Sequence, residues 1–244
     1  MTSTFGTATV WSGWLEDATL ALIAYVLLYL LYYFASDFRI MKKWRSRFGE
    51  RDGELERSVY LRRTMGFVLL GLVPALLVAV AFDRPLVDYG LSVPEGPYAW
   101  LWFLAPSVLL IAGSFARPAG KIDVSYYPEV RKPDWTRSRH VKNGFFWVLY
   151  LVGYEFGLRG MVFFSSLEAF GLWPAVVLNS VIYSLIHIFK GPGEAFGAFF
   201  LGVLFCLVAY FTGSLWIPLF IHAAMAIIND VKAVAAGKVR AHRP

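Results

Sequence analysis

The sequence has little cysteine and little charge. Its single cysteine, Cys206, excludes an internal disulfide and forms no metal-binding motif. Charged residues make up 16% of the 244 residues, against about 25% in a typical soluble domain. The N-terminus carries neither a basic segment nor an early apolar core, so we expect no cleaved signal peptide. We find no internal repeat, which argues against a small secondary transporter.

The sequence is instead rich in long apolar runs. Hydrophobic residues make up 58% of the chain, and the mean hydropathy is +0.56. The runs approach the length of roughly 20 residues that a helix needs to cross a bilayer. The sequence therefore predicts an all-α, polytopic transmembrane helical bundle that forms a single membrane domain over residues 1–244. The seven predicted spans cover residues 17–35, 64–82, 98–115, 143–165, 173–189, 195–211 and 215–234.

Lys and Arg gather in alternate connections between these spans. The connections 36–63 and 116–142, with Lys190 and the C-terminal tail, hold nearly all of them, and the opposite side holds only Arg84. By the positive-inside rule the N-terminus lies outside and the C-terminus is cytoplasmic. The net charge of +6 then reflects topology and contact with the lipid bilayer, and no nucleic-acid partner is expected. Arg62 and Arg63 are expected to end the first basic loop at the membrane.

The fourth span contains two ionisable residues, Glu155 and Arg159, inside an apolar run. A charged side chain at mid-bilayer costs roughly 2.5–3.5 kcal/mol, so such residues usually pair or carry function. Four positions apart, they share one helix face. One interpretation is an ion pair that only neutralises itself, and the other is a functional site. Gly153 and Gly157 flank Glu155 and predict close approach of another helix.

Further polar residues interrupt the later spans. Asn179, Tyr183 and His187 are spaced by four and form one stripe, in which we interpret Asn179 as helix-to-helix hydrogen bonding and His187 as functional. Glu194 lies in the first turn of the sixth span, where the helix dipole favours a carboxylate. It either has this capping role or takes part in catalysis. His222 lies in the middle of the seventh span.

Two polar residues, Asn229 and Asp230, follow near the inner end of the last span. They support the site or simply form a polar helix end. Glu155 and His222 each lie about 18 Å from the inner end of their own span, from the rise per residue of a helix. These equal depths are compatible with a water-filled cavity that opens to the cytoplasm.

Three segments, YEFGLRG, YSLIH followed by KGPGE, and TGSLWIPLFIH, resemble the motifs of the CAAX-protease and bacteriocin-processing family. The resemblance implies a catalytic core over about 143–230, with the spans in 17–115 as N-terminal additions. Tyr154 stands where the family has the first Glu of its pair, and Tyr183 replaces a Phe. Ala226 stands where the third motif has Asn or Asp. The chain is similar to a single-Glu branch in which Glu194 and Asp230 compensate.

The resemblance implies an intramembrane endopeptidase that cleaves a membrane-associated peptide or protein. In this hypothesis a carboxylate activates water, and Arg159 holds Glu155 in place while His187 and His222 stabilise the oxyanion. Tyr183, Asn229 and Asp230 are candidates for support. The expected location is a prokaryotic cytoplasmic membrane.

Two alternatives remain open at this point. We favour a mechanism without a cofactor, but Glu155, His187 and His222 could instead bind zinc. The chain could also be a catalytically silent relative that binds a membrane partner or acts as a chaperone.

Overall fold

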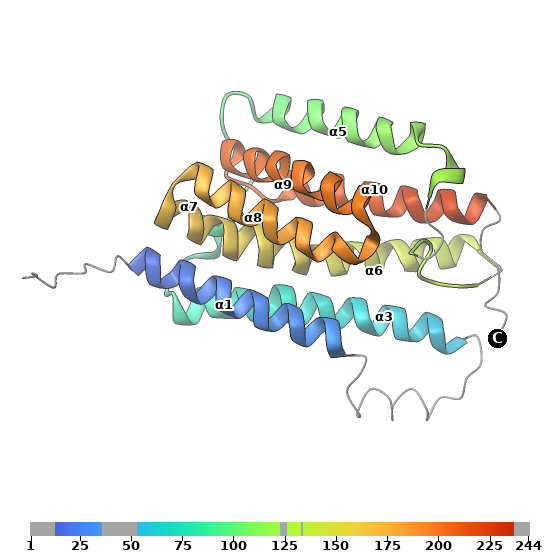
Figure 1. Ribbon diagram of the computed structural model, residues 1–244, viewed down its shortest axis with the longest axis horizontal. Helices are drawn as coiled ribbons and strands as arrows, with labels where there is room; N and C mark the ends of the chain where they lie inside the picture. The colour runs from blue at the N-terminus through green and yellow to red at the C-terminus, as the bar shows by residue number, and fades with distance from the viewer. Residues whose placement is uncertain (1–12, 36–52, 123–125, 133, 237–244) are drawn as a thin grey trace, which may run out of the picture.

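In the computed structural model the helices run side by side along one axis, and α6 lies in the middle of them (Figure 1). The structure describes residues 13–35, 53–122, 126–132 and 134–236. Most of the predicted basic loop 36–63 and the basic tail residues Lys238, Arg240 and Arg243 lie outside the described residues.

Seven helical segments of the described chain are long and apolar enough to cross a membrane, as the sequence predicts. Several are continuous runs of two to four consecutive elements. The elements are α1 (Gly13–Phe34); α3 (Gly53–Phe67), η2 (Val68–Leu72), α4 (Val73–Leu76) and η3 (Leu77–Ala81); α5 (Ala99–Ala116); α6 (Arg137–Glu155), η6 (Phe156–Phe164) and α7 (Ser165–Phe170); α8 (Leu172–His187) and η7 (Ile188–Lys190); α9 (Pro192–Thr212); and α10 (Trp216–Ala235). Two single 3-10 turns, η4 (Leu86–Tyr89) and η5 (Ala119–Lys121), lie in the connections.

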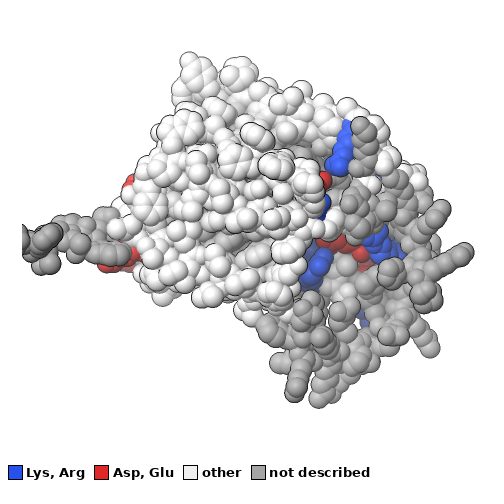
Figure 2. All heavy atoms as spheres, viewed as in Figure 1, with Lys and Arg blue, Asp and Glu red and all other residues white. Residues whose placement is uncertain are grey.

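The distribution of charge fits a protein that spans a bilayer. On the face that Figure 2 shows, a broad uncharged band separates the end that carries Lys and Arg from an end with a few acidic side chains. Seven apolar helices with this pattern identify an integral, multi-pass membrane protein. The orientation of the termini stays a prediction.

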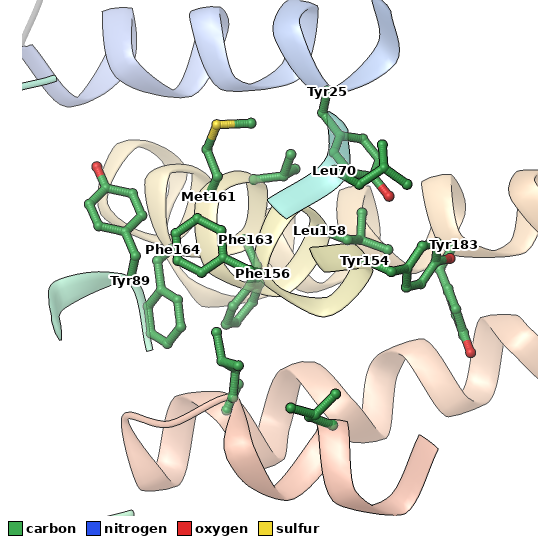
Figure 3. Packing of buried hydrophobic residues seen from close by; sticks show 14 of the residues in the cluster. Tyr25, Leu70, Tyr89, Tyr154, Phe156, Leu158, Met161, Phe163, Phe164 and Tyr183 are labelled. Atoms are coloured by element: carbon green, nitrogen blue, oxygen red, sulfur yellow. The ribbon is translucent and has the colours of Figure 1, made fainter. Parts of the chain in front are cut away.

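The span from Arg137 to Phe170 forms the centre of the bundle. Its most apolar 18-residue window is 78% buried, against 39% or less for the corresponding windows of the other spans. Figure 3 shows its η6 segment surrounded by buried aromatic and aliphatic side chains. A helix that is buried on all sides can keep ionisable groups away from lipid.

Glycines let the second span approach this central helix closely. A Cβ on Gly153 would come within 2.7 Å of the Cα of Phe67, and one on Gly157 within 2.3 Å of the carbonyl oxygen of Leu70. Gly71 faces Gly153 in the same contact. The close approach predicted for Gly153 and Gly157 is therefore confirmed.

Arg63 is buried near the start of the second span. It lies within the continuous helix from Glu56 to Ala81 and is 2% exposed. Its place at the membrane surface stays a prediction. Its guanidinium lies 3.2 Å from the carboxylate of Glu129 and 3.9 Å from that of Asp230. It also stacks over the ring of Trp147 at 3.9 Å. These partners, distant in sequence, are the physical reason why a charged residue can be buried here.

Candidate functional site

Glu155, Arg159 and His222 meet in the middle of the bundle. Oε1 of Glu155 lies 2.5 Å from Nδ1 of His222 and accepts a hydrogen bond from Nη1 of Arg159 at 3.1 Å. Glu155 and Arg159 are completely buried, and the His222 side chain is 15% exposed. The carboxylate therefore connects α10 to the central helix.

The local backbone explains how one helix can present both ionisable residues. Helix α6 ends at Glu155, and the nine residues of η6 have the wider hydrogen bonding of a π-helix. π-Helical turns are frequent at functional sites. Asn179 of α8 supports this turn, because its Nδ2 donates to the carbonyl of Leu158 at 2.6 Å, and its Oδ1 accepts from the thiol of Cys206. The predicted bridging role of Asn179 is confirmed.

Aromatic rings hold the two imidazoles. The ring of Tyr183 lies 4.5 Å from the ring of His187 and 6.0 Å from that of His222, with edge-to-face geometry in both pairs. The Arg159 guanidinium lies 4.1 Å from the Tyr183 ring centroid. The ring of Tyr154 also lies edge-to-face with that of His222, at 5.9 Å. Such packing limits the rotation of both histidines.

A cavity of about 900 Å³ extends from these residues to the charged end of the bundle. The side chains that line its inner part include Tyr154, Tyr183, His187 and His222. Nearer the charged end it is lined by residues that include Arg62, Arg117, Glu129, Lys190 and Glu194. Glu155 is fully buried, so it meets the cavity through His222. From the sequence, Glu155 and His222 are expected at equal depths in their spans, which is compatible with a cavity inside the bundle.

His187 is held by its own helix. Its Nδ1 lies 2.9 Å from the carbonyl oxygen of Tyr183, and a carbonyl can only accept. Nδ1 therefore carries a hydrogen, and in the neutral imidazole Nε2 is then an acceptor. His187 and His222 thus both use Nδ1 to bind the protein.

The remaining predicted residues lie apart from this centre. Glu194 lines the cavity, and its carboxylate lies 3.5 Å from Arg117. Asn229 also lines the cavity. Asp230 belongs to the cluster around Arg63, where its Oδ2 accepts hydrogen bonds from Asn143 at 2.8 Å and from Trp147 at 2.6 Å. The structure therefore brings Glu155, Arg159 and His222 into contact, and it places Asp230 with the helix ends.

The alternative zinc site is not assembled in the described structure. Within the described ranges, no three His, Cys, Asp or Glu side chains converge as metal ligands. Oε1 of Glu155 is already bound to His222 and Arg159, and Nδ1 of His187 is bound to a backbone carbonyl. A zinc ion held by Glu155, His187 and His222 would use the other atoms of these groups, and the three side chains would have to move together to bind it.

The ion pairs at the charged end of the bundle were not predicted from the sequence. Glu129 binds Arg62 at 3.1 Å and Arg63 at 3.2 Å, and it joins the connection after α5 to α3. Burial raises the pKa of Glu129, but the guanidinium groups of Arg63 and Arg62 and the ammonium of Lys190 outweigh it and hold the pKa below its ordinary value of 4.5. The one sequence signal was an acidic residue between two prolines in a basic loop.

The comparisons with known proteins bear on the same region. A family model described as type II CAAX prenyl endopeptidase Rce1-like matches residues 141–228. No curated protein and no solved structure matches the chain. The match starts in α6 and ends in α10, so it includes both halves of the contact between Glu155 and His222. Through residues 141–228, the chain is therefore similar to the CAAX-protease family.

Proposed function

We propose that this protein is an intramembrane endopeptidase in which Glu155 and His222 act together as the base. The observation that carries the proposal is the 2.5 Å contact between Oε1 of Glu155 and Nδ1 of His222, at the inner end of a cavity within the bundle. A carboxylate bound to Nδ1 fixes the tautomer of the imidazole and stabilises its protonated form. Nε2 of His222, on the opposite side of the ring, then faces away from the carboxylate.

The reaction follows from this arrangement. Nε2 of His222 takes a proton from a water molecule in the cavity while the water oxygen bonds to the carbonyl carbon of the peptide. The tetrahedral intermediate collapses when the same imidazolium gives its proton to the leaving nitrogen and the C–N bond breaks. While His222 is protonated, between these two proton transfers, the carboxylate of Glu155 compensates its positive charge. Arg159 holds the carboxylate from its other side.

His187 has a different role in this proposal. Because its Nδ1 donates to the Tyr183 carbonyl, its Nε2 is able to accept the second hydrogen of the same water. Two acceptors orient one water molecule better than one acceptor does, and orientation is a large part of rate enhancement. The Tyr183 ring between the two imidazoles sets their separation.

The cavity indicates the kind of substrate. It is lined by many aromatic and aliphatic side chains in its inner part and by both signs of charge toward one end. A peptide held at the membrane by an apolar group matches this gradient, because the apolar part can enter the bundle while polar atoms remain at the charged end. We therefore expect membrane-associated substrates to be cleaved better than soluble ones.

Cleavage by the purified protein in lipid vesicles tests the proposal. The substrate is a membrane-anchored peptide library read by mass spectrometry, and the matched control is Glu168→Gln, at an exposed position of α7 away from the cavity. We expect cleavage by wild type and by the control, and its loss in Glu155→Gln, because an amide cannot stabilise the imidazolium. Cleavage that persists unchanged in a folded Glu155→Gln protein would contradict the proposal.

A further inference from the structure

Several buried polar atoms of the residues around Glu155 have no hydrogen-bond partner in the part of the chain that the structure describes. They include the hydroxyls of Tyr25 and Tyr154, the second carboxylate oxygen, Oε2, of Glu155, and two nitrogens of the Arg159 guanidinium. Tyr25, Tyr154 and Glu155 are 1%, 2% and 0% exposed. Native proteins pair nearly all such buried groups, with protein atoms or with internal water.

These residues belong to one small region. The ring of Tyr25 packs against the turn that separates Glu155 from Arg159, since a Cβ on Gly157 would lie 2.9 Å from Cε2 of Tyr25. The hydroxyl of Tyr25 interacts electrostatically with Glu155 and Arg159, and that of Tyr154 with Tyr25 and Arg159. Figure 3 shows Tyr25 between α1 and the η6 segment, with Tyr154 on the central helix nearby. Two hydroxyls, a carboxylate and a guanidinium thus belong to buried residues that interact with one another.

The donors and acceptors among these atoms specify which hydrogen-bond partner fits them. A carboxylate oxygen only accepts, and a guanidinium only donates, whereas a tyrosine hydroxyl does both. An internal water molecule donates two hydrogens and accepts two, and it usually makes about three hydrogen bonds to groups of this kind. An apolar side chain or an anion would leave Oε2 of Glu155 unpaired.

We propose that Tyr25, Tyr154 and Oε2 of Glu155 bind internal water, and that this water positions Glu155 against His222. The site joins the central helix to α1, which lies outside the region matched by the family model. Tyr25 is then a positioning residue supplied by an N-terminal span. Its effect on catalysis rests on the proposed function, whereas the water site itself does not.

The sign of a stability change tests the water site. Tyr25→Phe and Tyr154→Phe each remove only a hydroxyl oxygen. If the hydroxyl binds water, its removal leaves that water and Oε2 short of a partner, and we expect the unfolding midpoint of the purified protein in detergent to fall by about 2–4 °C. The double variant should lose less than the sum of the two single losses, because both hydroxyls share one water network. Tyr29→Phe is the matched control, since Tyr29 stacks on Tyr25 and its hydroxyl is not one of these atoms.

A hydroxyl that is truly unpaired would behave in the opposite way. Removing it would relieve a buried polar group, so the midpoint of Tyr25→Phe and Tyr154→Phe would stay equal to that of wild type or rise. That result, or strict additivity in the double variant, overturns the proposal. These measurements need no substrate, so the absence of cleavage by wild type would contradict the proposed function and leave the water site standing.

The positioning role has its own measurement. In the vesicle cleavage assay we expect Tyr25→Phe to lower kcat several-fold while KM stays unchanged, because Tyr25 packs against the turn that follows Glu155 and does not line the cavity. A rise in KM with unchanged kcat would overturn the positioning role.

Discussion

Oε1 of Glu155 and Nδ1 of His222 are 2.5 Å apart, although 67 positions of sequence separate the two residues. One comes from the central helix and the other from the last span. The carboxylate has no exposed surface, and the imidazole lines the cavity. Chemistry at the cavity surface can therefore depend on a carboxylate that never meets the substrate.

This relationship predicts which carboxylate matters. Both Glu155→Gln and His222→Gln should lower the cleavage rate by about 10²–10⁴, the range for loss of a general base. Glu194→Gln should cost far less, because Glu194 lies toward the charged end of the cavity and pairs with Arg117. Initial rates at saturating substrate give the comparison. A larger loss in Glu194→Gln than in Glu155→Gln would identify Glu194 as the base.

The contact between Gly153 and the second span predicts a steep packing effect. In Gly153→Ala the new Cβ would meet backbone atoms of Phe67, which cannot move like the end of a flexible side chain. Overpacking of this kind costs roughly 1–3 kcal/mol, so we expect a lower unfolding midpoint and less folded protein in the membrane. Gly113→Ala is the control, because a Cβ there would meet nothing within 4 Å. Equal stability of the two variants would show that the second span does not pack as described.

Some of these features could be predicted from the sequence, and some could not. Apolar run lengths predict the seven spans, and the spacing of four between Glu155 and Arg159 predicts their pairing, because both signals are local. The partners of Arg63 lie in three distant segments, and no local pattern marks Glu129 or Asp230 as those partners. The contact between Glu155 and His222 also joins distant segments. Their equal depths in the bilayer suggested that they could meet, but only the packing of α10 on α6 gives the contact.

The ion pairs of Glu129 predict a dependence of stability on pH. Because the pKa of Glu129 is held below its ordinary value of 4.5 in the folded protein, its contribution is complete above about pH 4.5 and disappears as the pH falls through the lower folded-state pKa. The unfolding midpoint of wild type should fall more steeply below pH 4.5 than that of Glu129→Gln, which has already lost the contribution. Identical acid profiles for the two proteins would show that Glu129 does not bind Arg62 and Arg63 in solution.

The arrangement of the candidate ligands predicts the outcome of a metal analysis. We expect purified protein to contain no stoichiometric zinc, and a strong chelator to leave cleavage unchanged, since Glu155, His187 and His222 do not converge as metal ligands in the described structure. Elemental analysis of wild type and of His187→Ala makes the comparison. Stoichiometric zinc that disappears in the variant would replace the proposed base with a Lewis acid.

The distribution of Lys and Arg predicts the topology. Accessible tags at residues 50 and 130 and at the C-terminus should report the cytoplasm, and a tag at residue 90 should report the opposite side. The cavity extends to the end of the bundle that carries Arg62, Glu129 and Lys190, so this topology gives substrates access from the cytoplasm. Tags in intact cells and in inverted membrane vesicles distinguish the two sides. A tag at residue 130 on the outside would turn the cavity toward the exterior, and the search for a substrate would then move to proteins of that side.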